Sequence, residues 1–111
     1  MSTGIQNSII IEIDATSSAS ASYTLPRAGR VVDILIQDIA GIAGNVTATL
    51  AGSNLTTAVI ALPAAADALV RAVSIVDSAA DGAAGEVLAV SSSGATSRYK
   101  VFITLLAPVV V

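Results

Sequence analysis

Apolar and polar residues alternate with a period of two along most of this chain. The most regular example is residues 19–25, where alanine, tyrosine and leucine alternate with serine and threonine. Successive side chains of a strand point to opposite faces of a sheet, so this pattern predicts strands buried on one side. Comparable runs occupy residues 9–14, 31–37, 45–50, 56–62, 69–76, 86–92 and 98–107.

Turn-forming residues separate these runs, as at Pro26, Gly29, Gly52 and Asn54. About eight short strands with a turn roughly every ten residues are typical of an all-β fold. At 111 residues the chain has the length of one domain. We therefore predict an all-β protein, a single antiparallel β-sandwich or jelly roll of about eight short strands.

Residues 69–76 are compatible with either a strand or a helix. Pro63 followed by a run of alanines is also typical of a helix start. Val73, Ile75 and Val76 are β-branched and favour a strand, which is our preferred interpretation. A helical turn over residues 64–68 is compatible with either.

Composition adds a reason to expect a partner, because 54% of the residues are hydrophobic and only 12% are charged. Val31 and Leu35 fall on one face of the third run, and Phe102 and Leu106 fall on one face of the last run. A two-layer sandwich buries one face of each sheet, so these second faces need cover from neighbouring subunits or from a loop that folds back. We favour subunits, which makes these four residues the expected oligomer interface. The apolar residues expected on the opposite faces are Val32, Ile34 and Ile36 in the third run and Tyr99, Val101, Ile103 and Leu105 in the last.

Missing residue types exclude several kinds of chemistry. The chain has no His and no Cys, so imidazole acid–base catalysis, thiol nucleophiles and the usual zinc sites are excluded. The chain has five basic and eight acidic residues, so it lacks the basic surface that nucleic-acid binding requires. The long uncharged stretch between Asp38 and Asp67 is too rich in Gly, Asn and Thr for a membrane span. We expect no enzyme, no cofactor, no small-molecule substrate and no nucleic-acid or membrane partner.

The remaining polar clusters each have an ordinary explanation. Glu12 and Asp14 share a strand face, and Asp77 and Asp81 lie in one loop with residue types that calcium sites use. We interpret the first pair as a solvated face and the second as turn residues, with no metal site. Arg27 and Arg30, beside a proline–glycine turn, are suited to grip a partner's carboxylate or to form local ion pairs.

Sugar binding on a β-sandwich is the main alternative among binding functions. Such sites usually stack sugars on exposed aromatic rings, and this chain offers Tyr23, Tyr99 and Phe102. All three stand at positions where we expect a core residue.

Two segments and the closing strand carry a resemblance to a known class of protein. They are Tyr-Thr-Leu-Pro-Arg-Ala-Gly-Arg-Val-Val-Asp-Ile at residues 23–34 and Gly-Glu-Val-Leu-Ala-Val-Ser-Ser-Ser-Gly at residues 85–94, followed by the strand at 101–106 with Ala107 and Pro108. This arrangement resembles the small β-sandwich decoration (cement) proteins of tailed bacteriophage heads. The resemblance covers residues 19–108.

That resemblance implies a homotrimer on the outer capsid surface of a virion, where it bridges and stabilises the major capsid protein. It also implies an N-terminal arm, here residues 1–8, ahead of a β-sandwich domain at residues 9–111. The capsid contacts expected on this basis are Ile5, Gln6, Asn7, Arg27 and Arg30. Residues 1–8 lack the segments of a signal peptide, so we expect synthesis in the host cytoplasm. The alternative is a fibre-type or cell-surface recognition module that binds a glycan or receptor.

Overall fold

A computed structural model of the chain describes residues 5–94 and 96–109. All eight predicted runs contain a strand, and the all-β prediction is confirmed. Two further strands have two residues each, and one short 3-10 helix, η1, is present. The elements are β1 (Ile5–Ala15), β2 (Ser20–Thr24), β3 (Gly29–Asp38), β4 (Gly44–Leu50), β5 (Ser53–Asn54), β6 (Ile60–Leu62), β7 (Leu69–Arg71), η1 (Asp77–Ala79), β8 (Asp81–Gly82), β9 (Val87–Ser92) and β10 (Tyr99–Val109).

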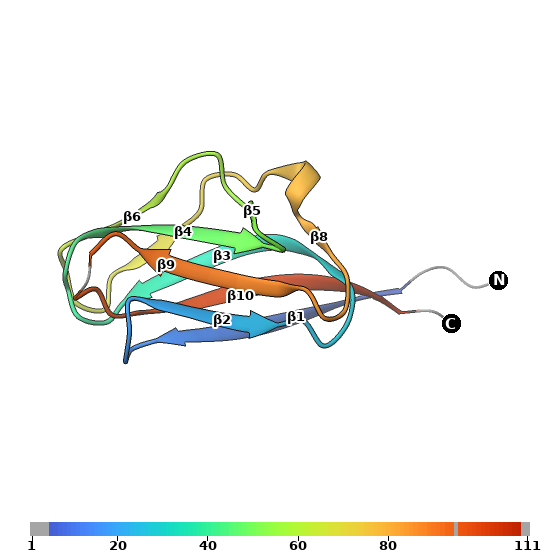
Figure 1. Ribbon diagram of the computed structural model, residues 1–111, viewed down its shortest axis with the longest axis horizontal. Helices are drawn as coiled ribbons and strands as arrows, with labels where there is room; N and C mark the ends of the chain where they lie inside the picture. Colours follow the sequence, from blue (N-terminus) through green and yellow to red (C-terminus); the bar gives the residue numbers. More distant parts are fainter. Residues whose placement is uncertain (1–4, 95, 110–111) are drawn as a thin grey trace.

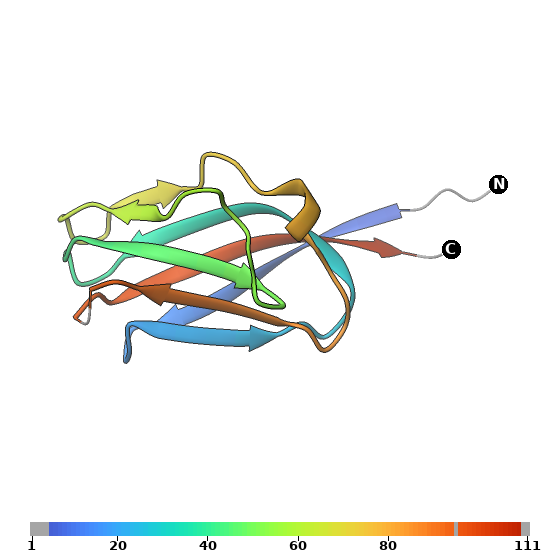
Figure 2. The same cartoon turned by 45° about the horizontal axis from the view of Figure 1, so that its top comes forward.

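The strands form two antiparallel sheets that face each other as a sandwich (Figures 1 and 2). Sheet A has the order β1-β10-β3-β7, with β8 also paired to β3. Sheet B has the order β2-β9-β4-β5, with β6 also paired to β4. One side of the sandwich is thus closed by β1 and β2 and the other by the short strands β5 to β8. The β-sandwich is confirmed, whereas the jelly roll stays a prediction.

The core lies between the sheets and follows the period of two. On β10, the four residues Tyr99, Val101, Ile103 and Leu105 are fully buried, as predicted. Sheet B supplies Val46, Leu50, Leu88 and Val90 from β4 and β9. Burying such β-branched and leucine side chains contributes roughly 1.5–3 kcal/mol each, which makes this layer the main source of stability.

The third strand breaks the expected alternation, and the prediction for Val31 is wrong. The pairing of β3 with β10 shifts register between Thr104 and Leu105, so that Thr104 pairs with Asp33 and Leu105 with Val31. Val32 has no partner in this register, as in a β-bulge, where one extra residue reverses the faces that follow. Val31 is therefore buried in the core and cannot form an interface, while Val32, expected inside, is 41% exposed.

Residues 69–76 begin as a strand, and the helical alternative is wrong. β7 covers Leu69–Arg71 and pairs with β3, and the residues up to η1 are irregular. The preceding segment forms a hydrogen-bonded turn in which the Ala68 N–H donates to the Ala65 oxygen. Asp67 has a φ of 63° in this turn, so the helical turn proposed for residues 64–68 is absent.

One tight contact lies within sheet A, and one hydrogen bond links the two sheets. Gly29 pairs with Gly82, and a Cβ on Gly29 would lie 2.6 Å from Cγ of Leu105, so no larger residue fits there. The Tyr99 hydroxyl, from sheet A, donates to the Ala19 oxygen at 2.7 Å, just ahead of β2 in sheet B. A buried tyrosine needs such a partner for its hydroxyl.

The first strand spans the expected boundary between the N-terminal arm and the sandwich domain. β1 begins at Ile5, so the boundary between residues 8 and 9 falls inside a continuous strand. Ile5, Gln6 and Asn7 pair with Val109, Pro108 and Ala107. Beyond Leu106, β10 pairs with β1 alone among the described strands, and this two-stranded ribbon projects from one end of the sandwich (Figures 1 and 2). Residues 1–4 of the expected arm lie outside the described residues.

Candidate interaction surfaces

The outer face of sheet A has a continuous group of apolar side chains, which we call the outer-face cluster. It consists of Ile10, Leu35, Leu69, Phe102 and Leu106. Phe102 lies directly opposite Leu35 in the register of β10 and β3. The other members are diagonal neighbours, a relation that brings side chains within about 7–8 Å. Ile10 is 67% exposed and Leu69 is 62% exposed, while the other three are half-buried.

Charged side chains border this cluster. Arg71 donates from Nε to both carboxylate oxygens of Asp33, at 2.9 and 3.2 Å. Lys100 lies 3.9 Å from Glu12 across β10 and β1. Solvent-exposed pairs of this kind stabilise the fold by at most about 1 kcal/mol each. Their position around an apolar centre is the usual arrangement of a protein–protein interface, with an apolar core and a polar rim.

Of the four residues predicted for the oligomer interface, the structure brings three together. Leu35, Phe102 and Leu106 belong to the outer-face cluster, whereas Val31 is in the core. Ile10 and Leu69 were missed by sequence reasoning. Ile10 could have been predicted from the sequence. Successive residues of a strand face opposite sides, so the adjacent residues Ile9 and Ile10 place an apolar side chain on each face. Leu69 could be added only once the pairing of β7 with β3 was known.

The predicted capsid contacts gather at one end of the molecule. Ile5, Gln6 and Asn7 form one strand of the projecting ribbon. The loop between β2 and β3, which holds exposed Arg27, turns at the same end (Figure 1). Arg30 pairs in register with Leu106, next to the ribbon, but its guanidinium is occupied by Asp77 and by Asp81, the latter at 3.0 Å.

The carboxylates singled out from the sequence make local ion pairs and hydrogen bonds. Asp77 and Asp81 both contact Arg30, which explains their proximity without a cation. Within residues 5–94 and 96–109, no group of three or more acidic side chains could hold a metal ion. Asp14 instead accepts hydrogen bonds from the Thr16 hydroxyl and from the Thr16 N–H at 2.9 Å, and these lower the pKa of its carboxyl below 3.8.

The outer face of sheet B is chemically different. The strands β2, β4, β5, β6 and β9 contain no charged residue. A shallow depression of about 400 Å³ on this face is lined by hydroxyl-bearing and small side chains. Its outward-facing members include Ser20, Ser22, Thr47, Thr49, Ala89 and Ser91.

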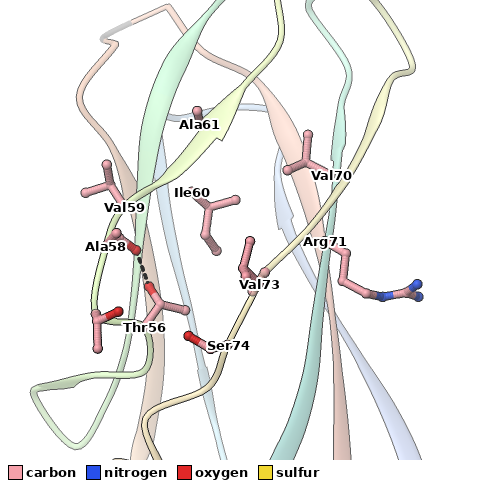
Figure 3. Close-up of a pocket in the computed structure, with 11 residues that line it drawn as sticks. Thr56, Ala58, Val59, Ile60, Ala61, Val70, Arg71, Val73 and Ser74 are labelled. Carbon is pink, nitrogen blue, oxygen red and sulfur yellow. Dashed lines mark hydrogen bonds between the residues drawn. The ribbon is translucent and has the colours of Figure 1, made fainter.

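A third surface is the groove between the segments that contain β6 and β7. Its volume is about 480 Å³, and Val59, Ile60, Val70 and Val73 are its larger apolar residues. Figure 3 shows Ile60 and Val73 facing each other across this space, with the Arg71 guanidinium turned away. Val73 is fully exposed and Val59 is 51% exposed. The groove therefore presents apolar surface on the side of the sandwich that the short strands β5 to β8 form. Sequence reasoning missed it, because it depends on the packing of two irregular segments.

The aromatic residues are placed differently from one another. Tyr99 is buried as expected, and burial raises the pKa of its hydroxyl to about 12. Tyr23, expected in the core, is 37% exposed because β2 is an edge strand of sheet B. Phe102 is half-buried in the outer-face cluster rather than in the core. None of the three lines the depression on sheet B.

Comparisons with models of protein families, with curated proteins and with solved structures found no match to this chain. Among the described residues, no helix has the length and apolar character that crossing a membrane requires.

Proposed function

We propose that this chain is a structural virion protein, which binds the outer surface of a phage capsid as an oligomer and stabilises the lattice of major capsid subunits. The observation that carries the proposal is the outer-face cluster of sheet A. It is an apolar surface on the outer side of sheet A, which no other described part of the chain covers at Ile10 and Leu69. Self-association through Leu35, Phe102 and Leu106 removes this surface from water. The burial favours association by about 25 cal/mol for each Å² of apolar area that is buried.

The projecting ribbon and the β2–β3 loop support the second half of the proposal. They are at one end of a molecule whose longest extent is 51 Å. An oligomer that presents several copies of this end to a repeating protein surface gains avidity from simultaneous contacts. Because it binds the assembled lattice and not free subunits, it stabilises that lattice by mass action. In this proposal, Ile5, Gln6, Asn7 and Arg27 are capsid contacts, and Arg30 supports the loop through its acidic partners.

The strand order is compatible with the finer fold that the resemblance implies. Strands from the two ends of the sequence pair in a nested way, β1 with β10, β2 with β9 and β3 with β8. A chain folded double in this manner and wrapped into two sheets gives a jelly roll, a build that capsid-associated domains use.

The test is co-sedimentation with heads of the phage that encodes the chain, prepared without their decoration. We expect the protein to pellet with expanded heads and to raise their resistance to heat or to chelation. Arg27→Glu, which changes an exposed loop residue, should weaken the association while leaving the solution mass unchanged. Failure of the wild-type protein to bind either expanded or unexpanded heads would reject the capsid function.

One observation favours a second candidate, a recognition module for glycans. The uncharged depression on sheet B offers several hydroxyl donors and acceptors on one surface. Binding of oligosaccharides on a glycan array, abolished by Thr49→Val but not by Phe102→Asp, would move the function to this face.

A further inference from the structure

The outer edge of β1 points to a contact between copies of the chain. We propose that two copies pair along this edge in antiparallel fashion, with Ile10 opposite Ile10 of the second copy, so that sheet A continues from one copy into the next. The inference rests on the lattice-bound oligomer proposed above, because a lattice holds neighbouring copies close together. It uses the edge of sheet A and not its outer face, so the two contacts can fail separately.

β1 is the longest open edge among the described strands. It has 11 residues and pairs with β10 alone, in a register that runs from Ile5 to Ala15 without a bulge. The other edge strands, β2 and β5 to β8, are two to five residues long. Proteins commonly protect their sheet edges with short strands, bulges, prolines or lysines, and β1 has none of these. Such an edge is suited to accept a further strand.

The ladder of sheet A shows which backbone groups of β1 point outward. The Ile39 N–H donates to the Arg98 oxygen at 2.9 Å, which extends the pairing of β3 with β10 and makes Arg98 a residue that bonds toward β3. Because residues of a strand bond alternately to its two neighbours, even-numbered residues of β10 bond to β3 and odd-numbered ones to β1. Odd residues of β10 pair with odd residues of β1, as Ile103 does with Ile11. The even residues of β1 therefore direct their N–H and C=O groups to the open edge.

These outward backbone groups are self-complementary about Ile10. In the proposed register the even residues pair only with one another: 10 with 10, 8 with 12 and 6 with 14 of the second copy. Every outward N–H and C=O from residue 6 to residue 14 then has a partner. The side chains agree with this register, because Ile10 meets Ile10 and the Ser8 hydroxyl meets the Glu12 carboxylate. The acidic residues Glu12 and Asp14 face no acidic residue, so no like charges are opposed.

The contact is expected to be weak between free particles. All four of Ser8, Ile10, Glu12 and Asp14 are exposed, and a single strand edge buries little apolar area against the entropy cost of association. Copies that a lattice holds side by side gain effective concentration, and the same contact then forms readily. A two-fold contact of this kind is complete with two copies, so it joins neighbours without continuing into a fibre.

The absence of cysteine from the chain makes a cross-linking test direct. The single-cysteine variants Ser8→Cys and Glu12→Cys are mixed at high protein concentration and oxidised with glutathione. Residues 8 and 12 of two copies are directly opposed in the proposed register, within the Cα separation of about 7 Å that a disulfide allows. Two copies of residue 8, or two copies of residue 12, are about 14 Å apart along the strands. Each variant oxidised alone is therefore the matched control, and mass spectrometry distinguishes the mixed disulfide from the two symmetric ones.

We expect the mixed disulfide to form at least tenfold faster than either symmetric one. A second pair of variants tests the main-chain hydrogen bonds. Ile10→Cys should cross-link to itself, and adding Ser8→Pro should slow this on the order of tenfold, because proline removes an outward N–H from each copy. Ser8→Ala keeps that N–H and should have little effect. Proline is tolerated at an edge position that donates no hydrogen bond within its own sheet, and circular dichroism verifies that the variant is folded.

Equal rates for mixed and symmetric disulfides would overturn the inference, as would equal slowing by Ser8→Pro and Ser8→Ala. Co-sedimentation with phage heads separates this inference from the proposed function. Binding to heads without the preferred disulfide rejects only the edge contact. The preferred disulfide without binding to heads keeps the edge contact and rejects the capsid function.

Discussion

The two outer faces of the sandwich come from strands with the same alternating pattern, yet they differ in charge and in apolar content. Sheet A strands hold eight charged residues, and most of these surround the outer-face cluster. Sheet B strands hold none, and serine, threonine and alanine line their outer face. Charges around an apolar patch keep the free protein soluble. They also determine which partner the patch binds. This difference is the reason for proposing the outer face of sheet A, and not that of sheet B, as the surface of self-association.

The largest expected effect on stability distinguishes two single substitutions on β3, one in the core and one on the outer face. Val31→Asp puts a carboxylate in the core and should cost several kcal/mol, enough to unfold a domain of this size. Leu35→Asp changes a half-buried residue of the outer face and should leave the fold intact. Circular dichroism with urea titration measures both. If Val31→Asp folded as well as Leu35→Asp, the bulge in β3 would be wrong.

The next largest effect is on self-association, and it distinguishes the outer face of sheet A from the outer face of sheet B. Phe102→Asp puts a charge at the centre of the outer-face cluster and should weaken self-association on the order of a hundredfold or more. Thr47→Asp makes the same change at a half-buried position on sheet B and should leave the solution mass unaltered. Both are compared by size exclusion with light scattering at matched concentrations. Dissociation by the Thr47 variant alone would transfer the interface to sheet B.

Alkaline pH should weaken the link between the sheets at Tyr99. The pKa of this hydroxyl is raised from 10.0 to about 12 by burial, so the unfolded chain loses the proton first as pH rises. Stability is therefore unaffected by this group below pH 10 and falls by on the order of 2 kcal/mol between pH 10 and 12. Urea unfolding across this range measures the fall. Tyr99→Phe should be less stable at neutral pH, because the Ala19 oxygen loses its donor, but should lack this part of the pH dependence.

The smallest effect concerns the exposed rim of sheet A. Hydrogen bonds from Thr16 lower the pKa of Asp14 below 3.8, so this carboxylate favours the fold above that value. The contribution is lost as pH falls through the lower folded pKa. NMR titration of the Asp14 carboxyl should show a pKa that moves back toward 3.8 in Thr16→Ala. An unchanged pKa would assign the shift to the backbone N–H of residue 16, which the substitution keeps, and to the charge of Lys100.

Sequence patterning predicted the fold well where strands are regular and poorly where pairing partners decide. The buried face of β10, with Tyr99 and Ile103, followed from alternation alone. The face of Val31 could not be predicted, because the bulge depends on how β3 pairs with β10. The partners of Arg30 come from η1 and β8, about fifty residues further along the chain. The groove beside Val73 likewise depends on two irregular segments that no local pattern brings together.

The solution mass of the wild-type protein tests the central claim most directly. Size exclusion with multi-angle light scattering, at micromolar concentration and ordinary salt, gives that mass without a label. Self-association through sheet A predicts a stable particle near three times the chain mass of 10.9 kDa. A well-behaved particle of 10.9 kDa throughout the concentration range would contradict the claim and leave the outer-face cluster as uncovered surface.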